Sequence, residues 1–556
     1  MSGLSEDERL WLLDGDQSFW RGMWRMVARG YNRVPVVAGA VPRLGIPGVR
    51  FTDGPRGVVV GTSTCFPVAM CRGASWDPAM EEEIGRAIGA EARAQGANLF
   101  AGVCVNLLRH PAWGRAQETY GEDPVHLGVM GAALTRGVRQ HVMACVKHYA
   151  LNSIENARFT VDVTVDDEAL HEVYLPHFKA VIDAGAEAVM SAYNSVNGHW
   201  AGQNHALLTA ILRQEWGFAG FVMTDFLWGL RDPVGSLAAG QDLEMPFRQQ
   251  RARHLPAALR SGQVAMADVE RAGTRIVAAQ LAHAATPRPP LAADVAACPQ
   301  HRALARRAAA RGMVLLRNEP IEGQAVLPLD KASVRSIAVV GRLAGKPNIG
   351  DKGSSAVRPP VTVSALAGIR SAFSTARVTH HDGADRPAAA RAAREADAAV
   401  VIAGYTAWDE GENIAGLDAA AISAMAPPPL NHPLLARTWA SLVAVAASRR
   451  LIPGGDRRSL RLHTRDENLI QLVADANPRT VVVVITGSAV VMETWRKHVP
   501  AILMAWYPGM EGGHAIADVL TGAAEPGGRM PMATPTDGGH LPFFDPRAPN
   551  ITYHRW

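Results

Sequence analysis

Short apolar runs alternate with longer amphipathic stretches through the first half of the chain. Two of the amphipathic stretches, at 77–96 and 166–185, have the apolar spacing of helices. The apolar runs are of strand length and lie at 48–51, 101–105, 142–146, 186–190 and 218–223. Strands that alternate with amphipathic helices indicate parallel strands joined by crossover connections.

Polar residues of chemical interest follow these apolar runs, at the predicted carboxyl ends of the strands. A (β/α)8 barrel gathers such residues at one mouth, and an open doubly wound sheet also places its site at strand carboxyl ends. The ends of these five runs, with GQDLEMP (240–246) as a sixth candidate, favour the barrel. We therefore predict an α/β protein whose first domain is a TIM-like barrel over 1–284.

A different organisation begins after a proline-rich stretch. Three prolines within five residues near 287–290 predict a semi-rigid linker over 285–302. Nearly all-apolar runs then recur at 334–341, 396–405, 479–488 and 500–509. Such runs are typical of a parallel sheet covered on both faces. The second domain, over 303–545, is thus predicted to be an α/β sandwich with a mostly parallel sheet.

An insert rich in alanine and proline interrupts the second domain at 414–453. Its pattern predicts no definite structure, and we interpret it as a lid or a solvent-exposed arm. A short tail, 546–556, follows the second domain.

Composition narrows the class of protein. The chain has 556 residues, 48% of them hydrophobic, and a net charge of +4, which fits a soluble protein of two domains. No Lys/Arg block indicates a nucleic-acid partner, and no run of about 18 apolar residues indicates a membrane span. The N-terminus lacks the features of a signal peptide, and the five cysteines form no CxxC pair. We therefore expect a cytoplasmic protein with reduced thiols.

The polar residues at the strand ends suggest a sugar site. Alone, Asp225 could equally be a turn residue or a helix cap. A barrel would bring it together with other residues that follow predicted strands. These are Asp53, Arg115, Lys147, His148 and Tyr193. Carboxylates accept hydrogen bonds from hydroxyl groups and repel phosphate, and aromatic rings cover the apolar faces of a pyranose. No glycine-rich phosphate loop, HExxH motif or histidine set with metal-ligand spacing occurs, so we expect no metal or organic cofactor.

Ordered motifs in both halves carry a resemblance to a known family. Those of the first half are FTDGPRG (51–57), WGRAQETYGEDP (113–124), CVKHYALNSIENAR (145–158), MSAYNSVNG (190–198), LRQEWGFAGFVMTDF (212–226) and AGQDLEMP (239–246). Those of the second half are GMVLLRN (312–318), GDKGSSAVRPP (350–360), GYTAWDEGEN (404–413), GGDRRSLRL (454–462), AWYPGMEGGHAIADVL (505–520) and PGGRMPMATP (526–535). The chain resembles glycoside hydrolase family 3, β-glucosidase type, over roughly residues 40 to 555.

The resemblance implies a retaining, exo-acting β-glucosidase. It assigns the nucleophile to Asp225, where the family's flanking Trp is replaced by Phe226. It assigns substrate binding to matching motif positions, namely Asp53, Arg115, Lys147, His148 and Tyr193. Phe226, which keeps an apolar ring face beside the nucleophile, is also expected to contact the substrate. Glu118 and Arg158 also match motif positions, and for these two we favour a supporting role as an ion pair behind the site.

The general acid/base is implied to be a glutamate of the second domain. Within DEGE (409–412), Glu410 matches the family's motif best, and Glu412 is the alternative. Trp408 either lines the leaving-group side of the site or is a core ring. The Asp-Arg pair that closely follows this glutamate in many members occurs here only after the insert, as Asp456-Arg457.

Alternative functions remain open within and beyond the family. The Lys-His motif and the Glu410 loop argue against an N-acetylglucosaminidase, whereas a β-xylosidase differs only around the sugar's C6 position. An inactive sugar-binding homologue is the alternative of a different class. The expected partner is a small carbohydrate or glycoside. The family's common fibronectin-like domain does not follow the tail 546–556, which predicts an exposed apolar surface and lower stability or a homo-oligomer.

Overall fold

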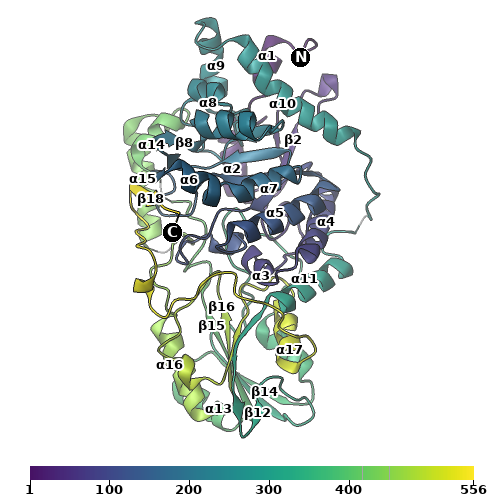
Figure 1. Ribbon diagram of the computed structural model, residues 1–556, viewed down its shortest axis with the longest axis vertical. Coiled ribbons are helices and arrows are strands. Elements are labelled where there is room, and N and C mark those ends of the chain that lie inside the picture. The colour runs from purple at the N-terminus through teal and green to yellow at the C-terminus, as the bar shows by residue number, and fades with distance from the viewer. Residues whose placement is uncertain (293, 416, 450, 556) are drawn as a thin grey trace.

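The computed structural model describes all residues except 293, 416, 450 and 556. Figure 1 shows two domains stacked along the long axis of the molecule, with the first domain above the second. No helix in this described part of the chain combines the length and the apolar character needed to cross a bilayer.

The first domain is built around a six-stranded sheet in the order β1-β2-β3-β4-β6-β9. Its strands are β1 (Val36–Ala38), β2 (Val49–Asp53), β3 (Leu99–Cys104), β4 (Met143–Tyr149), β6 (Ala188–Ser191) and β9 (Phe221–Met223). All neighbours are parallel except β1 and β2. The predicted parallel strands with crossovers are therefore confirmed, although these strands alone form only part of a barrel.

Two irregular segments, 13–18 and 243–248, continue the hydrogen bonding between the edges of this sheet. Asp16 N–H donates to Val37 of β1, Arg248 N–H donates to Gln17, and Thr224 N–H donates to Leu243. Neither segment forms a regular strand, and in 243–248 Pro246 has no N–H to donate. They also approach very closely, since a Cβ on Gly15 would lie 2.0 Å from the carbonyl oxygen of Pro246. The barrel is thus closed by irregular chain and not by the expected two further strands.

Apolar side chains fill the inside of this ring and helices cover the outside. The interior cluster includes Phe51, Met143, Cys145, Met190 and Phe221. Among the outer helices are α4 (Pro78–Ala94), α5 (Pro124–Arg139), α7 (Pro176–Asp183) and α10 (Met266–Ala285). Both α4 and α5 begin at an Asp-Pro pair whose aspartate caps the helix, as helix-start preferences predict. The regular outer helices leave the loops after the strands to form the site.

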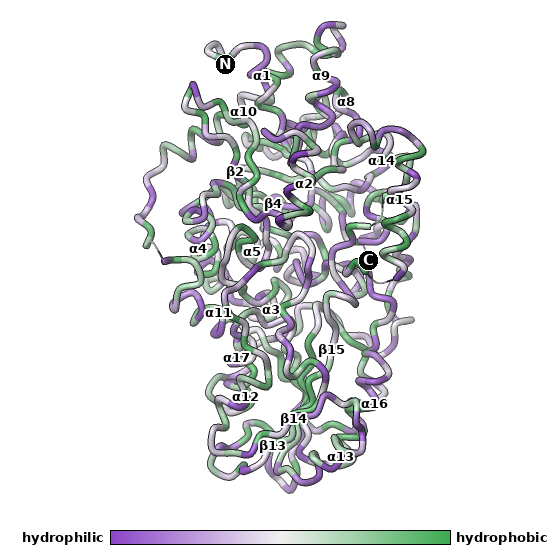
Figure 2. The backbone as a smooth tube through the Cα atoms, turned by 180° about the vertical axis from the view of Figure 1, so that it is seen from behind, coloured by the Kyte–Doolittle hydropathy of each residue, from purple (hydrophilic) through white to green (hydrophobic). Residues whose placement is uncertain are grey.

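The second domain contains a sheet in the order β10-β17-β16-β15-β13-β14. Its strands are β10 (Val314–Asn318), β13 (Ser336–Val340), β14 (Arg377–His381), β15 (Ala398–Gly404), β16 (Thr480–Ile485) and β17 (Ala501–Met504). Only β10 runs antiparallel to its neighbour. Figure 1 shows α17 (Gly512–Thr521) on one side of the sheet and α13 (Arg386–Arg394) and α16 (Thr464–Ala476) on the other. Figure 2 shows hydrophobic backbone along β15, and the predicted sandwich with a mostly parallel sheet is confirmed.

The insert of the second domain folds as two helices against the first domain. They are α14 (Ala419–Met425) and α15 (Pro433–Ser448), and Figure 1 shows them beside the upper domain, far from the second sheet. The insert leaves and re-enters its loop at adjacent glycines, because Gly411 and Gly455 exchange backbone hydrogen bonds. The insert therefore begins and ends at the same point of this loop.

The tail also returns to the first domain. Its strand β18 (Asn550–Tyr553) pairs in parallel with β5 (Asp162–Val165), which also pairs with β7 (Ser195–Val196). Tyr553 is buried and stacks on Tyr174. Residues 550–553 thus extend a small sheet on the first domain.

Candidate active site

A cavity of about 400 Å³ lies between the carboxyl ends of the barrel strands and loops of the second domain. Seven of the nine predicted site residues line it, namely Asp53, Arg115, Lys147, His148, Tyr193, Asp225 and Phe226. The second domain contributes Lys352, Gly353, Ser354, Glu412 and Ile414. The two predicted residues that do not line this cavity are Glu410 and Trp408.

Asp225 follows β9 and its side chain lines the cavity. Its Oδ1 accepts a hydrogen bond from Phe226 N–H at 2.8 Å. Its Oδ2 has no hydrogen-bond partner among the described residues, and His148 Nε2 lies 3.7 Å away. Burial raises the pKa of Asp225 to about 6, against the opposing effect of Arg158, Arg115 and Lys147. An ionised, unpartnered oxygen held at a strand end is suited to nucleophilic attack.

Asp53 and Lys147 form a buried ion pair at the inner end of the cavity. Lys147 Nζ lies 2.6 Å from Asp53 Oδ1, and the Tyr31 hydroxyl donates to Asp53 Oδ2 at 2.7 Å. Burial alone would lower the pKa of Lys147, but the Asp53 carboxylate keeps it above its usual value. Lys147 therefore stays charged, and the two side chains offer both an acceptor and donors to sugar hydroxyls.

His148 is neutral and its orientation is fixed by Asn106. Burial, together with the charges of Arg115 and Lys147, lowers the pKa of His148 well below its usual value. Its Nδ1 lies 3.1 Å from Asn106 Oδ1, which also accepts the His148 backbone N–H. Because Asn106 Oδ1 can only accept, Nδ1 carries the proton. Nε2 then faces Asp225 with a lone pair that can accept a hydroxyl proton.

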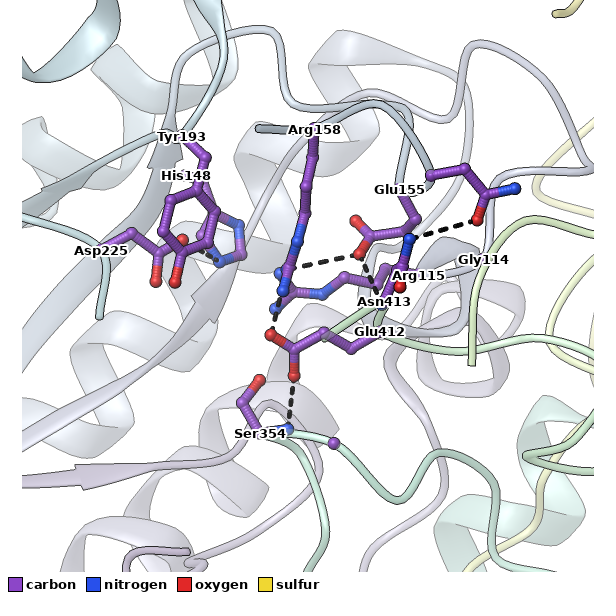
Figure 3. A network of polar contacts seen from close by, with 12 residues as sticks. Gly114, Arg115, His148, Glu155, Arg158, Tyr193, Asp225, Ser354, Glu412 and Asn413 are labelled. Atoms are coloured by element: carbon purple, nitrogen blue, oxygen red, sulfur yellow. Dashed lines mark hydrogen bonds and ion pairs between the residues drawn. The ribbon is translucent and has the colours of Figure 1, made fainter. Parts of the chain in front are cut away.

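Glu412 faces the cavity from the second domain and is held by Arg158. Arg158 Nη1 lies 3.0 Å from Glu412 Oε1 and 3.3 Å from Glu155 Oε2 (Figure 3). Ser354 N–H donates to Glu412 Oε2 at 2.5 Å. Burial would raise the pKa of Glu412, but Arg158, Arg115 and the Ser354 N–H lower it well below its usual value. Glu412 is thus ionised in the free protein.

Arg158 lies closer to the site than the sequence suggested. It lines the cavity beside Tyr193, with its guanidinium carbon 4.9 Å from the centre of that ring. Glu118, by contrast, lies outside the cavity and pairs with Arg115 at 2.7 Å, as the expected supporting ion pair. The motif alone could not distinguish the two, because both are charged residues at matching positions.

Glu410 lies in the interior of the second domain and not at the cavity. It is fully buried and pairs with Arg457, whose Nε lies 2.5 Å from Glu410 Oε2. Its other oxygen accepts hydrogen bonds from the Tyr507 hydroxyl and Gly487 N–H. Both carboxylate oxygens are therefore occupied, and the geometry favours the alternative, Glu412, as the residue that reaches the site.

Trp408 lies at a neighbouring hollow of the second domain. It is 44% exposed, and the Lys352 ammonium lies 5.8 Å from the centre of its ring. It is thus neither a core ring nor part of the cavity that contains Asp225.

The remaining wall of the cavity is apolar and was not anticipated from the sequence. It comes from the N-terminal helix α2 (Phe19–Arg29), the loop after β9 and the insert. Its residues are Met23, Met26, Leu227, Trp228, Ile414, Trp439, Val443 and Ile452. The only signal in the sequence was the apolar content of the insert. Among the described residues, no group of three or more His, Cys, Asp or Glu side chains could hold a metal ion.

Comparisons with known proteins agree with this arrangement. Residues 32–279 match the glycosyl hydrolase family 3 N-terminal domain, and 313–554 match the C-terminal domain. A β-glucosidase of Rhizobium radiobacter is 34% identical over 89% of this chain and 75% of its own length. The thermostable β-glucosidase B of Acetivibrio thermocellus is 33% identical over 91% of this chain and 63% of its own length. The structure of β-glucosidase 3B from Thermotoga neapolitana in complex with glucose is 27% identical, with a TM-score of 0.80, over 99% of this chain and 78% of that one.

Proposed function

The chain belongs to glycosyl hydrolase family 3 and is a glycoside hydrolase, and we propose that it is a retaining, exo-acting β-glucosidase. It would release terminal non-reducing β-D-glucosyl residues from glucosides or short oligosaccharides. The names of its relatives support this substrate. The observation that carries the mechanism is the unpartnered Asp225 oxygen, which shares a cavity with Glu412 of the other domain.

Asp225 and Glu412 would act in two steps. A carboxylate oxygen of Asp225 attacks the anomeric carbon while the glycosidic C–O bond breaks and Glu412 supplies a proton to the leaving oxygen. This gives a glycosyl-enzyme. Glu412, now ionised, takes a proton from water, which attacks the anomeric carbon and releases Asp225. Because each step inverts the anomeric carbon, the product keeps the configuration of the substrate.

The buried inner end of the cavity would hold the sugar. Asp53, Arg115 and Lys147 are each no more than 3% exposed, so this end is closed and accepts only a terminal residue. Charged donors and acceptors at fixed positions give hydrogen bonds about twice as strong as neutral ones. Phe226 and Tyr193 supply ring surface beside them.

Substrate must redistribute protons between the two carboxyl groups. In the free protein the pKa of Asp225 is raised and that of Glu412 is lowered, the reverse of what the first step requires. Arg158 is the main charge that lowers the pKa of Glu412. We expect the glycosidic oxygen to take the place of the Arg158 contact, so that Glu412 can be protonated, while sugar hydroxyls stabilise Asp225 as an anion.

A set of nitrophenyl glycosides tests the proposal. We expect the β-glucoside to be hydrolysed faster than the β-xyloside, with β-glucose as the first sugar seen by proton NMR. A 2-deoxy-2-fluoro-β-glucoside should label Asp225 in a peptide map. Initial α-glucose would overturn the retaining mechanism, and a faster xyloside would favour a β-xylosidase. Binding without hydrolysis of any glycoside would identify an inactive sugar-binding homologue.

We also propose a reducing, cytoplasmic setting. All five cysteines are unpaired, and four of them are buried, which supports it because free thiols persist in reducing compartments. Thiol titration of protein isolated from its source cells, with cell fractionation, tests this. Disulfide-linked protein in an extracytoplasmic fraction would contradict it.

A further inference from the structure

The outer part of the catalytic cavity is lined by apolar side chains from three separate parts of the chain. They are Met23 and Met26 of α2, Trp228 of the loop after β9, and Trp439, Val443 and Ile452 of the insert. The buried charged residues lie together at the other end, and Lys352, which is exposed, is the charged residue of the lining that does not belong to that group. The cavity therefore has a polar part suited to one sugar and an apolar part that continues from it.

The insert is held in place as a wall of this cavity by the first domain. The last carbonyl groups of α14 accept hydrogen bonds from Gln249, Gln250 and Arg253 near α9 (Gln250–Arg260). Trp20 of α2 donates its indole N–H to the Pro428 carbonyl oxygen at 2.6 Å. Ile422 packs with Trp228 in an apolar cluster between the two domains. These contacts fix the position of the insert on the barrel, where its side chains face the site.

Such a wall is poorly suited to a second sugar. The rings of Trp228 and Trp439 can cover one apolar face of a pyranose. A pyranose here would still lose the water bound to its hydroxyls, and the apolar side chains cannot replace those hydrogen bonds. An apolar group, by contrast, is favoured in proportion to the surface that it buries. The whole cavity, about 400 Å³, is of the size that encloses a drug-sized ligand and not only a monosaccharide.

We propose that the preferred substrates are β-glucosides whose aglycone is a bulky apolar alcohol, bound between α2 and the insert. This rests on the proposed β-glucosidase activity and adds the class of leaving group. Trp439 and Val443 of α15 determine this specificity on one side, and Met23 and Met26 do so on the other. α15 is hydrophobic along much of its length (Figure 2), with Trp439 42% exposed, so the wall is available in the free protein.

A homologous series of alkyl β-glucosides tests the proposal. Burial of one methylene favours binding by about fourfold, so kcat/KM should rise from butyl to octyl β-glucoside by at least about tenfold even if only half the added chain is buried. Octyl glucoside should also be a better substrate than cellobiose. β-D-glucosyl fluoride, whose leaving group does not reach the apolar wall, is the reference in each case.

Variants assign the effect to the insert. The relevant quantity is the ratio of kcat/KM for octyl glucoside to kcat/KM for glucosyl fluoride. Trp439→Ser should lower this ratio by about fivefold or more, because the octyl chain loses part of its apolar contact surface. Leu442→Ser is the matched control, because Leu442 lies on the same helix, is 64% exposed and does not line the cavity. Its ratio should equal that of the unmodified protein. Met23→Gln provides a second test from the opposite wall.

The outcomes separate this inference from the proposed function. If glucosyl fluoride and nitrophenyl glucoside are both inert, the proposed activity itself fails. If they are hydrolysed but cellobiose is preferred to octyl glucoside, or the ratio is unchanged by Trp439→Ser and Met23→Gln, the apolar aglycone is refuted. A dimer that Trp439→Ser dissociates, with no alkyl preference, would show that a second copy covers this wall.

Discussion

Replacing Glu410 should mainly lower the stability of the protein, whereas replacing Glu412 should mainly lower its activity. Although only one residue separates them, Glu410 is enclosed with Arg457 in the second domain and Glu412 faces Asp225 across the cavity. We expect Glu410→Gln to lower stability and leave turnover by folded molecules largely intact. Glu412→Ala should lower turnover strongly and change stability less.

The magnitudes follow from what each carboxylate contacts. Loss of the Glu410 charge leaves the guanidinium of Arg457, 4% exposed, without its partner, and breaking a buried pair in this way costs about 3–5 kcal/mol. At about 2–4 °C per kcal/mol for a domain of this size, the melting temperature should fall by roughly 6–20 °C. When Glu412 is lost, Arg158 keeps a second carboxylate, Glu155, at 3.3 Å, so this loss costs less stability. Loss of a general acid lowers the rate by about 10²–10⁴.

Leaving-group dependence distinguishes the two roles. Glu412→Ala should reduce kcat/KM strongly for alkyl glucosides and little for the dinitrophenyl glucoside, which departs without protonation. Azide should restore turnover and yield a β-glucosyl azide. Thermal unfolding of both variants, with activity expressed per folded molecule, completes the assay. If Glu410→Gln instead showed the leaving-group dependence and the azide rescue, the argument from burial would be refuted.

Three further expectations concern the same site. For the dinitrophenyl glucoside, which needs no general acid, the acid limb of kcat/KM should lie near pH 6, because Asp225 attacks only when ionised and its pKa is raised to about 6; Glu412→Ala should move that limb to lower pH, since the Glu412 charge raises this pKa, and an unmoved limb would contradict the assignment. Lys147→Met leaves Asp53 buried without its cation and should lower kcat/KM for glucosides by about 10–100-fold, as loss of a charged hydrogen bond predicts, whereas an unchanged kcat/KM would remove Lys147 from the sugar site. The fragment 1–284, produced alone, should not hydrolyse nitrophenyl glucoside, because Glu412 lies outside it, and measurable turnover would show that the first domain suffices.

Residues at strand ends are predictable because local pattern and barrel topology determine their position. Asp53 ends β2, Lys147 and His148 lie near the end of β4, and Asp225 follows β9. Parallel strands of a closed sheet direct these ends to one mouth. A short apolar run followed by a charged residue is therefore enough to predict that these side chains come together.

The choice between Glu410 and Glu412 could not be made in the same way. It depends on Arg457, which is separated from the loop by the insert and returns to it through backbone hydrogen bonds such as those between Gly411 and Gly455. Barrel closure was similarly hidden. Segment 13–18 lacks the apolar alternation of strands, and in 243–248, where apolar residues do alternate, Pro246 interrupts the run. Both features depend on contacts between distant parts of the chain, which local pattern does not encode.

The same pair of glycines explains how the loop carries a large insert without displacing the residue that the site requires. Because Gly411 N–H and carbonyl both pair with Gly455, the chain on either side of the insert is held as if the insert were absent. Asp456, the next residue, accepts hydrogen bonds from Gly114 N–H and Asn156 N–H of the first domain, which ties this point of the loop to the barrel. Glu412, one residue beyond Gly411, is thereby positioned by backbone contacts that the insert does not make. The insert is then free to differ in sequence and to shape the aglycone side of the cavity, while the distance between the two carboxylates is set by the glycine pair and the domain contact.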